Sequence, residues 1–96
     1  PDLVWLKDPE GRYQIFNQRF LQQTGLEPAQ LKGRSDLELF PEAEAELYRS
    51  GDQAAIDHGQ HELAPHWRQF ADGHRELIVA HKTRIHDARG DLLGVL

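Results

Sequence analysis

Residues 61–96, HELAPHWRQFADGHRELIVAHKTRIHDARGDLLGVL, decide the fold. Residues 61–70 and 75–85 follow a period of two, which is typical of half-buried β-strands, and residues 92–96 form a short apolar run that also reads as a strand. The turn-forming groups ADG and DARGD separate the three segments, so each strand can fold back on the one before it. Pro65 cannot donate a ladder hydrogen bond, which places its strand at an edge of the sheet. The stretch therefore predicts an antiparallel meander.

The middle strand of this meander has two faces of different character. One face holds Leu77, Val79, His81, Thr83 and Ile85. If that face points inward, His81 and Thr83 present polar groups to an otherwise apolar pocket, a pattern suited to orienting a small ligand. Ile78 and Ala80 then lie on the opposite face, where they would pack against a flanking helix or a second copy of the chain.

The N-terminal half combines short strands with short helices. Residues 3–6 and 12–17 are rich in strand formers and flank a DPEG turn, which predicts a hairpin. Asn17 suits a helix N-cap and Gly25 a helix stop, so a helix of about two turns is expected between them. Further helical segments are expected at residues 28–32, 35–40 and 42–58, of which the last is the longest. The order of elements predicts an α+β fold with one five-stranded antiparallel sheet and helices on one face.

Composition narrows the classes of partner. The 96 residues include 11 Lys and Arg against 16 Asp and Glu, a net charge of −5. Because the basic residues are scattered, nucleic acid and anionic lipid are not expected as partners. The chain has no cysteine, which fits a cytoplasmic location, and no apolar run approaches the roughly 20 residues of a membrane span. We expect residues 1–96 to form a single domain excised from a larger protein.

Three stretches, in a fixed order, carry a family resemblance. They are WLKDPEGRYQIFNQRFLQQTG at residues 5–25, LKGRSDLELFP at residues 31–41, and residues 70–96. The first contains Asn17 and Phe20 in an N-x-x-F arrangement. Together the stretches resemble the opening hairpin and first helix, the connecting helices, and the closing strands of PAS domains, especially those of bacterial sensor kinases and cyclic-dinucleotide enzymes.

The resemblance implies an architecture and a role. It implies the strand order 2-1-5-4-3, with a pocket between the sheet and the helices. It also implies a non-catalytic sensor domain that binds a small organic molecule, forms a homodimer, and relays a signal to an effector in the same multidomain signalling protein, either a histidine kinase or a cyclic-di-GMP enzyme. The alternative is a ligand-free PAS module for dimerisation and signal relay, whose cavity is filled by its own side chains.

Candidate pocket residues follow from combining the resemblance with the strand patterns. They are Phe16, Phe20, Leu39, Phe40, Ile56, Trp67, Val79, His81 and Thr83. Trp67 could stack on a ligand ring, although large aromatic residues on strands also serve as packing. His81 could instead be a core histidine bonded to a backbone carbonyl. The interface candidates are Ile78 and Ala80.

No cofactor or metal is expected. The segment NQRFLQ is similar to the flavin motif of photosensory LOV domains, but Gln18 stands where that motif has its reactive cysteine, so flavin is disfavoured. Haem is disfavoured because His58, the histidine of the long helix, lies at its very end. None of the six histidines forms an i, i+4 pair on one helix, and apart from His81 we expect them on the surface.

Nothing in the sequence predicts catalysis by this domain. Glu42, Glu44 and Glu46 do not converge on a shared proton as a catalytic pair would. Ser35 has no evident base partner and is better explained as a helix cap.

Overall fold

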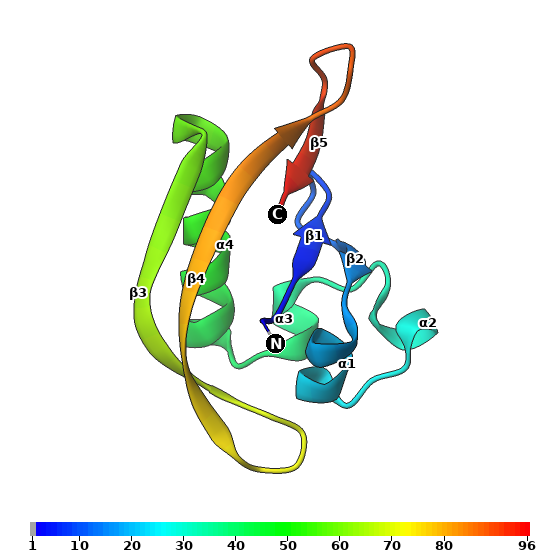
Figure 1. The fold of residues 1–96 in the computed structure, drawn as a ribbon, viewed down its shortest axis with the longest axis vertical. Helices are drawn as coiled ribbons and strands as arrows, with labels where there is room; N and C mark the ends of the chain where they lie inside the picture. The colour runs from blue at the N-terminus through cyan, green and yellow to red at the C-terminus, as the bar shows by residue number, and fades with distance from the viewer. Residues whose placement is uncertain (1) are drawn as a thin grey trace.

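Five antiparallel strands form one sheet in the order β2-β1-β5-β4-β3, and the helices pack on one of its faces (Figure 1). The structure is a computed structural model that describes residues 2–96. The strands are β1 (Trp5–Lys7), β2 (Tyr13–Phe16), β3 (Gln60–Gln69), β4 (Arg75–His86) and β5 (Leu92–Val95). The helices are α1 (Gln18–Thr24), α2 (Pro28–Leu31), α3 (Asp36–Leu39) and α4 (Glu42–His58). The predicted α+β class and strand order are confirmed.

Pro65 lies where it was expected, on the edge strand β3. The pairing of β3 with β4 shifts register between Leu63 and His66, so the segment around Pro65 forms a bulge. The bulge accommodates a residue that has no N–H to donate.

The start of α1 is fixed by a side chain that holds two segments together. Asn17 Oδ1 accepts from the backbone N–H of Phe20, at 3.0 Å, and from that of Val4, at 3.1 Å. The first bond caps the helix, and the second ties the cap to the segment that leads into β1. Gly25 ends α1 in the left-handed conformation, with φ of 71°. The predicted cap and stop are both confirmed.

The apolar core consists of two clusters that share two aromatic residues. One cluster centres on Tyr13, Phe20 and Leu31, and the other on Tyr48, Leu63 and Ala80. Trp5 and Phe40 pack against both clusters. The shared rings make one continuous aromatic layer between the sheet and the helices.

The inward face of β4 is the opposite of the expected one. Ala80 and Lys82 are only 5% and 2% exposed, whereas Val79 is 43% exposed and the His81 side chain 73% exposed. The expectation that Val79, His81 and Thr83 face inward is therefore wrong, as is the expectation that Ala80 faces away from the helices. Alternation was read correctly, but alternation alone does not say which face is buried. The inner face carries lysine because carboxylates from distant helices meet it.

Asp52 holds two strands against α4. Its carboxylate oxygens accept from Lys7 Nζ of β1, at 2.6 Å, and from Lys82 Nζ of β4, at 2.7 Å. Gly51 beside it leaves room for this approach, since a Cβ there would lie 3.1 Å from Lys82 Cε. The absence of a side chain at Gly51 therefore lets the lysine lie along the helix.

Replacing Asp52 should unfold much of the domain. Asp52→Asn removes the carboxylate that pairs with the buried ammonium of Lys82 and leaves Lys7 paired with Asp36 alone, and removing one partner from a buried ion pair costs about 3–5 kcal/mol. The exposed Asp57→Asn, on the same helix, should cost less than about 0.5 kcal/mol. Urea titration measures both free energies of unfolding. Adding Lys82→Met to Asp52→Asn should recover part of the lost free energy of unfolding. Equal losses in Asp52→Asn and Asp57→Asn would contradict the role of Asp52.

Gly94 lets β5 approach β1. Its φ is 146°, and a Cβ built there would lie 1.7 Å from the carbonyl oxygen of Lys7. Gly90 also has a positive φ, of 87°, but open space around it. Gly94→Ala should therefore lower the free energy of unfolding by about 3 kcal/mol more than Gly90→Ala does, measured by urea titration. Similar losses in the two variants would show that the contact with Lys7 is unimportant.

Candidate functional site

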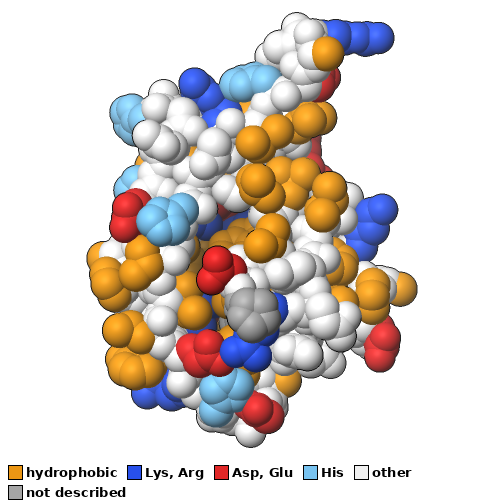
Figure 2. Space-filling view, viewed as in Figure 1, with side chains coloured by type: hydrophobic (Ala, Val, Ile, Leu, Met, Phe, Trp, Pro, Cys, Tyr) orange, Lys and Arg blue, Asp and Glu red, His pale blue; other side chains and the backbone are white. Residues whose placement is uncertain are grey.

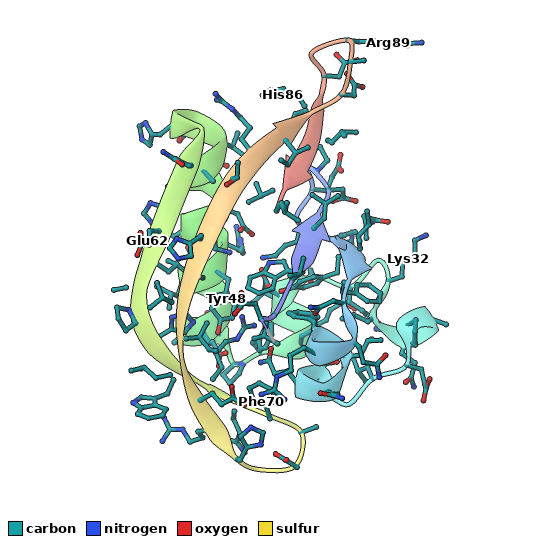
Figure 3. All side chains as sticks on the ribbon, in the orientation of Figure 1. Lys32, Tyr48, Glu62, Phe70, His86 and Arg89 are labelled. Atoms are coloured by element: carbon teal, nitrogen blue, oxygen red, sulfur yellow. The ribbon has the colours of Figure 1, made fainter. Side chains whose placement is uncertain are left out.

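An arginine lies in the middle of the aromatic layer. Arg68 points from β3 into the space between sheet and helices and is 1% exposed. Four rings surround its guanidinium carbon, with centroid distances of 4.6 Å to Tyr48, 5.1 Å to Trp5, 5.2 Å to Phe40 and 5.9 Å to Phe20. Figure 3 shows Tyr48 near the centre of the molecule, well inside the outer strand that carries Glu62. Arg68 is thus enclosed by π-faces.

The guanidinium of Arg68 lacks hydrogen-bond partners. Within residues 2–96, its Nε, Nη1 and Nη2 atoms are buried and donate to no acceptor. Ring faces attract the positive charge, by about 2 kcal/mol when desolvated, but they do not replace in-plane acceptors. Because an unpaired buried charge is costly, a hydrogen-bond acceptor that reached Arg68 would bind it with a large gain in free energy.

A second group of buried charges lies beside Arg68 and is fully paired. Lys7 Nζ donates to Asp36 Oδ2 at 2.5 Å and to Asp52, while Lys82 Nζ donates to Asp52. Tyr13 Oη donates to the remaining oxygen of Asp36. Strands β1, β2 and β4 are joined in this way to α3 and α4.

Burial shifts the pKa values of three hydrogen-bond donors in this region. Desolvation, reinforced by the carboxylate of Asp36, raises the pKa of Tyr13 well above its usual value. Burial likewise raises the pKa of Tyr48, so both phenols stay protonated at neutral pH. Burial, followed by the neighbouring ammonium of Lys7, lowers the pKa of Lys82.

A hollow of about 440 Å³ borders the aromatic layer. It lies between α1, the start of α4 and the end of β3, and its walls include Gln23, Leu39, Phe40, Glu44 and Phe70. The ring of Phe40 borders both this hollow and the guanidinium of Arg68. Glu44, at the rim, accepts a hydrogen bond from Tyr48 Oη at 2.6 Å. Phe40 is therefore shared by the hollow and the surroundings of Arg68, which does not itself line the hollow.

The nine pocket candidates fall in different places. Phe16, Phe20, Leu39 and Phe40 belong to the aromatic layer or pack against it. Ile56 borders a hollow beside Lys7 and Asp52. Val79, His81 and Thr83 border an outer hollow between β1 and β4, and Trp67 is 56% exposed on the outer face of β3. The structure does not bring the nine together, and their binding of a ligand stays a prediction.

Sequence reasoning missed the residues that dominate the interior: Lys7, Tyr13, Asp36, Tyr48, Asp52, Arg68 and Lys82. Their one local signal is the alternation of β4, in which Lys82 shares a face with Ile78 and Ala80. The alternation alone does not show that this face is buried, because the carboxylate that pairs with Lys82 comes from Asp52, 30 residues earlier in the chain.

Three further findings concern metal ligands, His74 and the helices. Within the described part of the chain, residues 2–96, no group of three or more His, Cys, Asp or Glu side chains is placed to hold a metal ion. His74 lies at the β3–β4 turn, where hydrogen bonds to Glu76 and Asp72 raise its pKa. Among residues 2–96, no helix has the length and apolar character needed to cross a membrane.

A comparison with protein families agrees with this architecture. The model of a family described as "PAS fold" matches residues 1–96, the whole chain. The chain belongs to the PAS family. PAS domains are generally non-catalytic sensory modules, and the family assignment made from the sequence is confirmed. No curated protein matches the chain.

Several solved structures resemble this PAS domain. VqmA from Vibrio cholerae, solved bound to DPO, is 26% identical with a TM-score of 0.83, and the match covers 99% of this chain and 48% of that one. Other VqmA structures are of a dimer and of a complex with ligand and DNA. A PAS domain from Colwellia psychrerythraea is 18% identical, with a TM-score of 0.74 and coverage of 97% and 79%. This chain spans less than half the length of the VqmA chains.

Proposed function

We propose that this PAS domain is a sensor that binds a small organic molecule between its sheet and its helices. The observation that carries the proposal is Arg68, whose unpaired donors lie inside a layer of aromatic rings. A flat ligand could stack on those rings and accept hydrogen bonds from the guanidinium. The ligand of VqmA, a protein of the same fold and 26% identity, supports the proposal.

We propose that the signal passes through the sheet to an effector domain of the same protein. The family resemblance indicates that this effector is a histidine kinase or a cyclic-di-GMP enzyme. Arg68 lies on β3, and Lys82 on the neighbouring β4 is bonded to Asp52 of α4. A ligand that shifts β3 would therefore act on the strand that carries this ion pair. VqmA also binds DNA in one of its structures, but the net charge of −5 supports a domain that does not itself contact nucleic acid.

Native mass spectrometry of the purified domain tests the proposal. We expect a 1:1 complex whose extra mass disappears on denaturation, and a visible spectrum without haem or flavin bands. Protein from which the molecule has been removed should regain thermal stability when a cell extract containing that molecule is added. The proposal fails if the native protein carries no added mass and its own cell extract does not raise its melting temperature.

A second candidate function, dimerisation, is supported by the outer face of the sheet. The apolar side chains exposed there include Trp67, Leu77 and Val79, and Trp67 lies directly opposite Leu77 across β3 and β4. The face drawn in Figure 2, where β3 and β4 lie in front of α4 in Figure 1, carries several groups of hydrophobic side chains. This face takes the interface role that the sequence assigned to Ile78 and Ala80.

Substitutions on this face test dimerisation. Leu77→Glu should raise the dissociation constant of the dimer at least tenfold, because it places a charge inside an apolar contact. Leu37→Glu, an equally exposed leucine on α3, should leave the dimer intact. Analytical ultracentrifugation measures both dissociation constants. A monomeric wild-type domain, or equal weakening by the two variants, would count against this interface.

A further inference from the structure

We infer that the ligand of this domain is a planar monoanion, such as an aromatic carboxylate, and that the guanidinium of Arg68 binds its negatively charged group. The inference rests on the proposed function and adds the chemical class of the ligand. Three independent features of the interior carry it: the balance of buried charge, the free donors of Arg68, and the rings around them.

The buried charges do not cancel. Among residues 2–96, the buried charged side chains are three cations and two carboxylates: Lys7, Arg68, Lys82, Asp36 and Asp52. Both lysines are paired with the two aspartates, at 2.5 to 2.7 Å. The excess positive charge therefore belongs to Arg68, and one negative charge from a ligand would neutralise the interior.

The donors of Arg68 select the shape of the negatively charged group. Its Nε and both Nη atoms are unpartnered within residues 2–96. A guanidinium presents parallel N–H groups in a rigid fork that matches the two oxygens of a carboxylate. The phenols nearby do not compete, because Tyr13 donates to Asp36 and Tyr48 to Glu44.

The rings around Arg68 select a flat ligand. The rings of Trp5, from β1, and Phe20, from α1, have centroids 5.2 Å apart, and Phe40 packs edge-on against Tyr48. Trp5 and Phe40 pack against both core clusters, so a ring entering beside them contacts aromatic surface throughout. Entry past Phe40 from the hollow fits one negative charge better than two, because the carboxylate of Glu44 lies at its rim.

Benzoate and benzamide provide a matched pair of probes, because they share size and shape and differ in charge. Titrations at constant ionic strength would follow the side-chain Nε–H signal of Arg68 by NMR in protein labelled with ¹⁵N-arginine. We expect benzoate to shift this signal and to bind at least tenfold more tightly than benzamide. Equal binding of the two probes, or no shift with benzoate, would overturn the inference.

Variants at Arg68 separate binding from folding. Arg68→Met should leave the unliganded domain folded, because Arg68 makes no hydrogen bond within residues 2–96 and Met fits the same apolar surroundings, while abolishing the preference for benzoate. Arg68→Lys keeps the charge without the fork and should retain an intermediate preference. The exposed Arg49→Met should behave as the wild type. An unchanged preference for benzoate in Arg68→Met and Arg68→Lys would overturn the assignment of Arg68.

The molecule that co-purifies gives a readout independent of the probes. If it is bound stoichiometrically and carries one carboxylate or another single negative charge on a planar framework, the inference stands. If it is bound stoichiometrically but is neutral, the inference on ligand class fails while the sensor proposal survives. The two proposals can therefore fail separately.

Discussion

The bridge from Asp52 to Lys7 and Lys82 is the interaction on which the rest of the structure depends. It joins the longest helix to a strand from each half of the chain, and each of these ion pairs connects residues at least 30 positions apart. Through Lys7 it extends to Asp36 and to Tyr13, so α3 and β2 are also held. A 96-residue chain has a small apolar core, and this network supplies specific contacts where apolar area is limited.

The same interior treats its two kinds of cation differently. The lysines, compact point charges, are saturated by carboxylates that arrive from the helices. Arg68 makes cation–π contacts with the surrounding rings, and these contacts leave its N–H donors without acceptors. The paired lysines stabilise the frame, and the arginine is left as the polar group that an incoming molecule can satisfy. In the proposed function, stability and recognition therefore belong to adjacent but separate side chains.

Local signals in the sequence predicted the order of elements, the caps and the edge position of β3. The cap at Asn17, the stop at Gly25 and the edge position of Pro65 each depend on the chemistry of one residue and its near neighbours. The inward face of β4 depends instead on Asp52, 30 positions before Lys82, and alternation alone is symmetric between the two faces. The aromatic surroundings of Arg68 are hidden for the same reason, since its four rings come from β1, α1, α4 and the residue after α3.

The bulge around Pro65 has a consequence for assembly. At one edge of the sheet, β3 offers a ladder interrupted by a proline, and at the other edge β2 is only four residues long. Neither edge is a good template for adding strands from further copies, so growth into open-ended filaments is blocked. A self-complementary contact between copies on the open face of the sheet, opposite the helices, would instead close after two subunits. An irregularity that weakens one strand thus favours finite complexes over continuous ones.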